Sequence, residues 1–239
     1  MQHAPLPFFN DRRTPIDILM YHCSAQNTVG MLDILKKTEL SCHYIIDLDG
    51  TITQVVAEEK RAWHGGLGYW REIKEDVNSH SIGIELCSPS LGQEPYSQKQ
   101  IDSLIHLSRD IISRYHITPQ NIIGHSDFAP TRKADPGKAF PWQYLAKQGI
   151  GLWYDLSFAA TAPTANLKEL LAGIGYDTRT SEAYTASQYA FARRFLPHLV
   201  TTVDDIQYLV DNVYPPQTDF STDETFILTA QAVYMRFQA

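Results

Sequence analysis

The chain is poor in cysteine, and it lacks long apolar runs and an excess of basic side chains. Its three cysteines, Cys23, Cys42 and Cys87, are odd in number and are not spaced as metal-binding pairs. This excludes a disulfide framework and a cysteine-only zinc cluster. No segment approaches the run of about 18 apolar residues that a transmembrane helix needs. The net charge is -7 and the Lys and Arg residues are scattered, so we expect neither a membrane span nor a nucleic-acid partner.

With 239 residues and 44% hydrophobic content, the chain can bury the core of one large domain, or of a medium domain and a small one. Its amino-terminal residues do not form a cationic segment followed by an apolar stretch, as an export signal would. We therefore expect either a cytoplasmic protein, or a mature or trimmed form whose export signal is missing from this chain. Nothing in the composition indicates an oligomeric state.

The first 153 residues alternate between the patterns of strands and helices. Apolar runs predict strands over residues 16–22, 81–87 and 122–124, and helical spacing predicts helices over 29–37 and 97–115. Residues 43–47 and 51–56 flank Asp49-Gly50, which predicts a β-hairpin. Ser97 and Gln100 predict a capping box at the start of the longer helix. Strand, helix and strand in succession indicate an α/β sandwich.

The composition changes after residue 153, where only helical stretches are predicted. They cover residues 165–172, 182–196, 203–210 and 222–237. Residues 155–164 are small, polar and proline-bearing, as linkers often are. We therefore expect a first domain over residues 1–158 and a small all-α domain over residues 165–239.

His22, His125 and Asp135 are the candidate metal ligands. His22 ends the first apolar run, His125 ends the run at 122–124, and Asp135 lies in a loop bounded by glycine and proline. Two imidazoles and one carboxylate are a ligand set that leaves a zinc ion one open position for water. The alternative for each histidine is a hydrogen-bonded core residue at the end of a strand.

Three neighbouring residues compete for the same role. Asp127 lies two residues beyond His125 and shares its face if the strand continues, so it is an alternative to Asp135. Cys23 follows His22 directly, so its side chain points to the other face of the strand. His43 lies in the predicted hairpin, and we interpret it as a packed residue near the site.

Hydrolysis of an amide needs more than a metal that lowers the pKa of water toward about 7. A group must protonate the leaving nitrogen and a positive charge must face the oxyanion, and Glu85 and Lys133 are of the right types. Glu85 is alternatively a buried carboxylate paired with an arginine, and Lys133 a solvated lysine. Trp63 and His64 either line a substrate groove or belong to a packed loop.

Four segments together carry a family resemblance: "YHCS", "SCHYIIDLDGTITQVVAEEKRAWHGG", "SIGIELCS" and "IIGHSDFAPTRKADPGKAFPWQYL". In this order they resemble the zinc-dependent N-acetylmuramoyl-L-alanine amidases of the amidase-2 type, over roughly residues 15–153. The resemblance implies that His22, His125 and Asp135 bind Zn²⁺. It also implies that Glu85 is the acid/base residue and that Lys133 stabilises the tetrahedral intermediate.

The same resemblance implies a fold and a substrate. The fold is a mixed central β-sheet with helices on both faces, and the bond cleaved joins N-acetylmuramic acid, or its anhydro form, to L-alanine in peptidoglycan or muropeptides. The segments "LKELLAGIGYD" and "ASQYAFARRF" are similar to the small three-helix peptidoglycan-binding modules of exported members, with residues 201–217 as an extra helix and loop. Two rival functions are a non-catalytic peptidoglycan recognition module and a zinc hydrolase of another amide.

Overall fold

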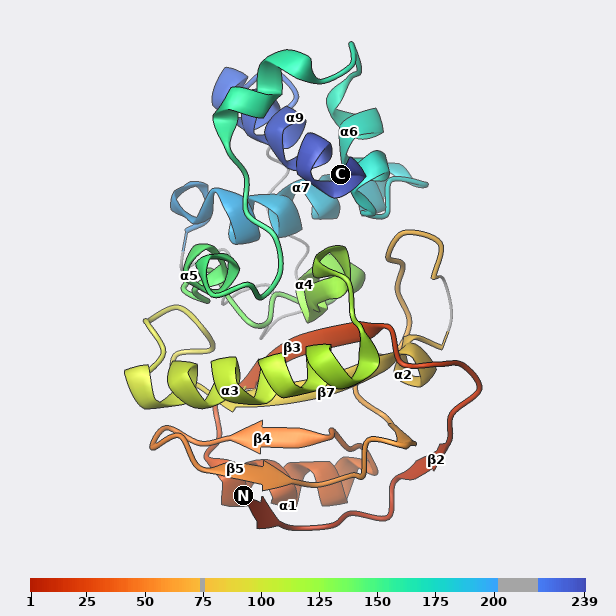
Figure 1. Cartoon of the computed structure of the whole chain (residues 1–239), viewed down its shortest axis with the longest axis vertical. Helices are drawn as coiled ribbons and strands as arrows, with labels where there is room; N and C mark the ends of the chain where they lie inside the picture. Colours follow the sequence, from red (N-terminus) through yellow and green to blue (C-terminus); the bar gives the residue numbers. More distant parts are fainter. Residues whose placement is uncertain (74–75, 202–218) are drawn as a thin grey trace.

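The computed structural model describes residues 1–73, 76–201 and 219–239, and contains a six-stranded mixed sheet in the lower half of the view in Figure 1. The strand order is β1 (Gln2–His3), β5 (Ile52–Gln54), β4 (Tyr44–Ile46), β7 (Ser81–Cys87), β3 (Ile18–Ser24) and β8 (Ile122–Gly124). Strands β4, β7, β3 and β8 run parallel, whereas β5 runs antiparallel to β4 across the predicted hairpin. A separate antiparallel pair joins β2 (Phe9–Asp11) to β6 (Lys60–Ala62).

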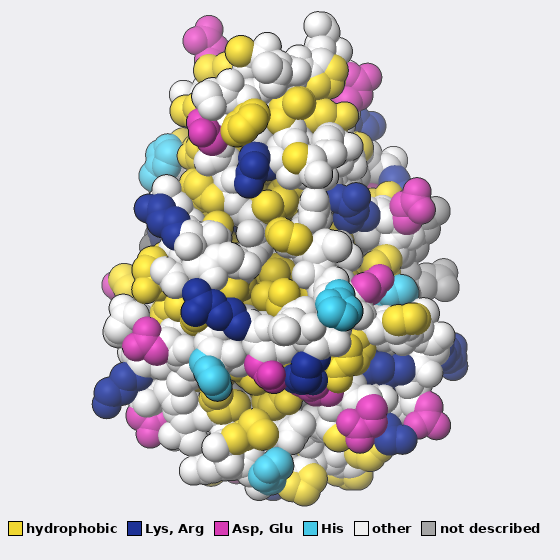
Figure 2. All heavy atoms as spheres, in the orientation of Figure 1, with side chains coloured by type: hydrophobic (Ala, Val, Ile, Leu, Met, Phe, Trp, Pro, Cys, Tyr) yellow, Lys and Arg dark blue, Asp and Glu magenta, His cyan; other side chains and the backbone are white. Residues whose placement is uncertain are grey.

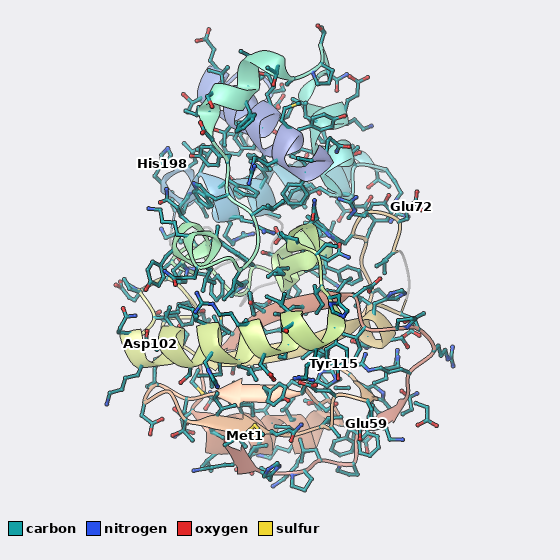
Figure 3. The ribbon with its side chains drawn as sticks, in the orientation of Figure 1. Met1, Glu59, Glu72, Asp102, Tyr115 and His198 are labelled. Atoms are coloured by element: carbon teal, nitrogen blue, oxygen red, sulfur yellow. The ribbon has the colours of Figure 1, made fainter. Side chains whose placement is uncertain are left out.

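Helix α3 (Gln98–Tyr115) covers one face of this sheet, and Figure 3 labels Asp102 and Tyr115 near its two ends. The predicted capping box is present, because Ser97 and Gln100 bond to each other's backbone amides. Side chains in β7 alternate, so that only one set packs under α3. The residues that α3 shares with the strands in this core include Ile82, Ile84, Leu86, Leu104 and Ile111. Helix α5 (Trp142–Lys147) adds Trp142 and Leu145 to it.

Helix α1 (Thr28–Thr38) packs on the opposite face. It begins at Asn27, whose side chain accepts a hydrogen bond from the Gly30 amide, and it buries Met31 and Leu35 in a cluster that includes strand residue Ile45. Two single-turn helices, α2 (Val77–His80) and α4 (His125–Phe128), directly precede β7 and directly follow β8. Helices therefore flank a mixed sheet on both faces, which confirms the predicted fold class.

The C-terminal region is helical, as predicted, and lies beyond α4 at one end of the molecule (Figure 1). Its helices are α6 (Leu167–Ile174), α7 (Ser181–Phe195) and α9 (Glu224–Gln238), each capped at its start by a polar side chain. Figure 3 labels His198 at the outer edge of this region, in the 3-10 turn Pro197–Leu199. The predicted helix at 203–210, and all but the first residue of the extra segment at 201–217, lie outside the described residues.

One hydrophobic cluster connects the C-terminal helices to the sheet. It contains Ile18 and Met20 of β3, Ile123 of β8 and Phe128 of α4, together with side chains of α6, α7 and α9. The predicted linker contains the 3-10 helix Leu156–Thr161, which contacts α9. The division into domains at 158 and 165 stays a prediction, and the hydrophobic core is continuous across it.

On the face shown in Figure 2, acidic and basic side chains are interspersed over the surface. This matches the scattered Lys and Arg residues of the sequence. Within the ranges that the structure describes, no helix combines the length and apolar character needed to cross a bilayer.

Candidate active site

The centre of the site is set by the register of two parallel strands. His22 of β3 lies directly opposite Glu85 of β7. Their neighbours Tyr21 and Ile84 belong to the core under α3, so alternation places His22 and Glu85 on the other face of the sheet. His125 begins α4 immediately after β8, and Asp135 follows in the next loop. The parallel strands therefore end at the edge where these side chains meet.

His22, His125 and Asp135 converge on one point and are all buried. His22 Nδ1 lies 3.0 Å from His125 Nδ1 and 3.2 Å from Asp135 Oδ2, and the third distance, from His125 Nδ1 to Asp135 Oδ2, is 3.1 Å. A tetrahedral zinc with bonds of about 2.0–2.1 Å holds its ligand atoms about 3.3 Å apart. The three atoms thus have the spacing of one face of such a site.

The outward nitrogen of His22 belongs to a hydrogen-bonded chain that fixes its tautomer. The Ser81 hydroxyl donates to the Val77 carbonyl at 2.7 Å, so Ser81 Oγ accepts from His64 Nε2 at 3.2 Å. His64 Nδ1 then carries a lone pair and accepts from His22 Nε2 at 2.9 Å. This leaves a lone pair on His22 Nδ1, directed at His125 and Asp135.

His125 is oriented in the same way by a backbone carbonyl. Its Nε2 donates to the Gly65 oxygen at 2.9 Å, so its Nδ1 also presents a lone pair. Burial and the neighbouring His125 lower the pKa of His22 to about 4, so His22 is neutral at pH 7. Two nitrogen lone pairs and a carboxylate oxygen at about 3 Å repel one another unless a cation lies between them, and this donor set fits a divalent metal.

Asp135 is the charged member of the group. A cation placed between the three groups would favour the ionised form of this buried carboxylate. The competing Asp127 is occupied elsewhere. Its carboxylate accepts hydrogen bonds from the Gly124 amide, the Tyr176 hydroxyl and the Arg194 guanidinium.

One cavity of about 190 Å³ contains every residue that the sequence predicted for the site. These are the three candidate ligands together with Trp63, His64, Glu85 and Lys133. Further walls come from residues that the sequence did not single out: Leu35, Leu40, Ser41 and Leu91. Cys23 also lines the cavity, although it is not part of the converging group.

Glu85 has the environment of an acid/base group. Burial, reinforced by Asp135 and partly offset by Lys133, raises its pKa to about 8. Its Oε2 is buried and has no hydrogen-bond partner among the residues described here, so no arginine pair satisfies that oxygen. A carboxyl group at the cavity wall with a pKa near neutrality is suited to accept and return a proton.

Trp63 and His64 take different positions in the same cavity. Trp63 Nε1 donates to Asn10 Oδ1 at 3.1 Å while the residue lines the wall. Both ring nitrogens of His64 are bonded to protein atoms, so neither is left for a substrate. The geometry therefore favours a role for His64 in orienting His22, rather than in contacting the substrate. Contact between Trp63 and the substrate stays a prediction.

The loop that carries Asp135 is supported by a close backbone contact that no sequence pattern indicated. Gly92 has a φ of +72°, and a Cβ at this position would lie 2.0 Å from the Pro136 carbonyl oxygen. The Ala139 amide also donates to the Gly92 oxygen at 2.9 Å. Only glycine allows this approach without strain, so Gly92 supports the loop that follows Asp135.

Two imidazoles, a carboxylate, an acid and a lysine in one cavity at the edge of an α/β sheet are the groups typical of metal-dependent hydrolases. Comparison with known proteins narrows this class. The chain belongs to the N-acetylmuramoyl-L-alanine amidase family (Amidase_2), which matches residues 12–138.

Individual relatives are similar to this chain beyond residues 12–138. The N-acetylmuramoyl-L-alanine amidase AmiD of Escherichia coli is 39% identical over 211 residues, which cover 77% of this chain and 76% of that protein. The structure of AmiD with the substrate anhydro-N-acetylmuramic acid-L-Ala-D-gamma-Glu-L-Lys matches with a TM-score of 0.74 at 31% identity, over 95% of this chain and 92% of AmiD. AmpDh3 of Pseudomonas aeruginosa, in complex with anhydromuramic pentapeptide, matches with a TM-score of 0.71 at 29% identity, over 92% and 90%. The chain is an N-acetylmuramoyl-L-alanine amidase.

Proposed function

We propose that this amidase is zinc-dependent and cleaves the amide between N-acetylmuramic acid, or its anhydro form, and L-alanine in peptidoglycan or muropeptides. The observation that carries the proposal is the triangle of His22 Nδ1, His125 Nδ1 and Asp135 Oδ2, with separations of 3.0–3.2 Å. The complexes of AmiD and AmpDh3 with anhydromuramyl peptides support the choice of substrate.

Zn²⁺ is the metal that this donor set suits best, because two imidazoles and a carboxylate leave one coordination position open. Held by these three atoms, the ion supplies Lewis-acid activation of a water molecule near neutral pH. The chain contributes the orientation of the ligands. His64 and the Gly65 carbonyl each hold the outer nitrogen of one imidazole and direct its lone pair inward.

Glu85 manages the protons of the reaction. A cation held beside it would favour its ionised form, and in that form it accepts a proton from the attacking water as the new carbon–oxygen bond forms at the lactyl carbonyl. It then delivers that proton to the alanine nitrogen as the carbon–nitrogen bond breaks. The products are N-acetylmuramic acid, or its anhydro form, with a free lactyl carboxylate, and a peptide with a free amino terminus.

Lys133 lines the same cavity and carries the positive charge required opposite the carbonyl oxygen. We assign it to stabilisation of the negative charge that develops on this oxygen in the transition state. Trp63 and Leu40 provide apolar wall surface for the sugar or the stem peptide.

The setting of the enzyme follows from the same proposal. That residues 165–239 form a peptidoglycan-binding module stays a prediction. A substrate in the cell wall places the enzyme in the cell envelope if an export signal precedes this chain, and recycled muropeptides place it in the cytoplasm otherwise. Fractionation of cells that produce the full-length gene product distinguishes the two.

The decisive experiment incubates purified muropeptides with the zinc-loaded protein and identifies the products by mass spectrometry. We expect a free stem peptide and a free sugar that ends in N-acetylmuramic acid or its anhydro form. Both products should be lost on chelation and recovered when zinc is added back. Intact muropeptides after incubation with zinc-replete protein would refute the proposal. Cleavage of only some other amide would favour the rival zinc hydrolase.

A matched variant separates metal binding from turnover. Glu85→Gln should retain one zinc per chain, because Glu85 is not in the ligand triangle, and should lose about 10²–10⁴-fold in turnover. Wild-type protein that binds muropeptides without binding zinc would instead support the recognition module.

A further inference from the structure

Asp127 is a buried charge next to the metal site that the proposed reaction does not use. Its side chain is 1% exposed, and it is the third residue of α4, the turn that begins with His125. Asp127 Oδ2 accepts from the Gly124 amide at 2.9 Å and thereby caps this turn. The position of His125 relative to β8 therefore depends on this carboxylate.

The partners that hold Asp127 come from the C-terminal helical region. Arg194 of α7 has a side chain that is 2% exposed, and its Nη1 lies 2.7 Å from Asp127 Oδ2. The hydroxyl of Tyr176, which follows α6, donates to Asp127 Oδ1 at 2.7 Å. The side chains of Asp127, Arg194 and Tyr176 are all buried. If one of these hydrogen bonds is lost, no water is available to take the place of the missing partner.

Arg194 also reaches the strand that leads to His125. Its Nη2 donates to the Ile122 carbonyl at 3.1 Å, and its guanidinium carbon lies 4.1 Å from the centre of the Trp142 ring. One rigid guanidinium thus bonds to the chain three residues before His125 and two residues after it. A side chain from α7 fixes both ends of the segment that presents this imidazole.

We propose that Arg194 and Tyr176 are positioning residues of the metal site, acting on His125 through Asp127. The C-terminal helices are then part of the framework of the active site, whatever they bind on their outer surface. The inference rests on the proposed function in one respect, namely that His125 is a ligand of zinc.

The test measures zinc affinity by competition with a chelating dye, in the full chain and at a temperature where each variant is folded. We expect Arg194→Met to weaken zinc binding about 10–100-fold, as loss of groups that orient a ligand does. Tyr176→Phe removes a single hydroxyl, so it should give a smaller loss in the same direction. Should Arg194→Met fail to fold, Tyr176→Phe alone decides the outcome.

Phe226→Leu is the matched control. Phe226 is fully buried among the C-terminal helices, 5.0 Å from the Phe191 ring, and is not among the partners of Asp127. It should lower the melting temperature without changing zinc affinity. Equal zinc affinity in wild type and Tyr176→Phe, or a comparable loss in Phe226→Leu, would overturn the inference. Failure of the wild type to bind zinc would instead refute the proposed function.

Discussion

Replacing Glu85 by glutamine in the metal-free protein should make the fold more stable, and increasingly so as the pH rises from about 5 to 8. The folded protein keeps Glu85 protonated up to a pKa of about 8, whereas the unfolded chain releases that proton near 4.5. Between these values the folded state binds more protons than the unfolded state, so wild-type stability falls with rising pH. Glutamine has no proton to lose and does not carry this cost.

The size of the effect follows from the difference between the two pKa values. At about 1.4 kcal/mol per pKa unit, the shift from 4.5 to about 8 sets an upper limit of roughly 4–5 kcal/mol. Glu85 is partly exposed at the wall of the cavity, and water there reduces the cost of its charge. We therefore expect Glu85→Gln to exceed the wild type by about 2 kcal/mol in free energy of unfolding at pH 8, and by nothing below pH 4.5.

Urea denaturation at a series of pH values, in the presence of a chelator, measures the difference between the two proteins. Glu58→Gln is a control of opposite sign. Burial would raise the pKa of Glu58, but its hydrogen bonds to Arg114, Tyr44 and Tyr115 lower it, so the charged form stabilises the fold above pH 4.5. A stability difference between wild type and Glu85→Gln that stays flat from pH 5 to pH 8 would refute the reasoning. Zinc added in place of the chelator should reduce the pH dependence of this stability difference, because a nearby cation favours the ionised form of Glu85.

Three further substitutions test other parts of the site. Lys133→Met should lower kcat/KM about 10²–10³-fold and leave the zinc content at one per chain, so loss of zinc would show a structural role instead. His64→Phe should weaken zinc affinity about 10–100-fold, because His22 loses the acceptor for its outer N–H, and unchanged affinity in dye competition would contradict this. Gly92→Ala combines a positive φ with a close contact to Pro136, so it should cost at least about 1–2 kcal/mol in thermal unfolding, and a neutral result would refute the contact.

Local patterns were sufficient for the elements that depend on neighbouring residues. The capping box of α3 is formed within four residues, and the Asp49-Gly50 hairpin turn is equally local, so both follow from the sequence alone. The pair β2–β6 was missed, because its three-residue strands have no alternation to detect and are 49 residues apart. Residues 125–128 form a helical turn instead of continuing the strand, which is why Asp127 does not share a face with His125.

The candidate site could be predicted as a set of residue types but not as a network. Their positions at strand ends and the family resemblance were sufficient to select five candidate residues, and all five line one cavity: His22, Glu85, His125, Lys133 and Asp135. The partners that orient them leave no mark in the sequence. Ser81 and His64 are 17 residues apart, and Asp127 and Arg194 are 67 apart, so only the folded chain shows that they are bonded.

The pairing of His22 with Glu85 across two central strands has a consequence for how such an enzyme can diversify. Hydrogen bonds between the two strands, rather than loop packing, set the spacing between the proposed metal ligand and the proposed proton carrier. The walls at Leu40 and Leu91 belong to connecting segments outside that ladder. Mutation can therefore reshape the groove for other glycan ends or stem peptides while the distance on which the chemistry depends stays constant.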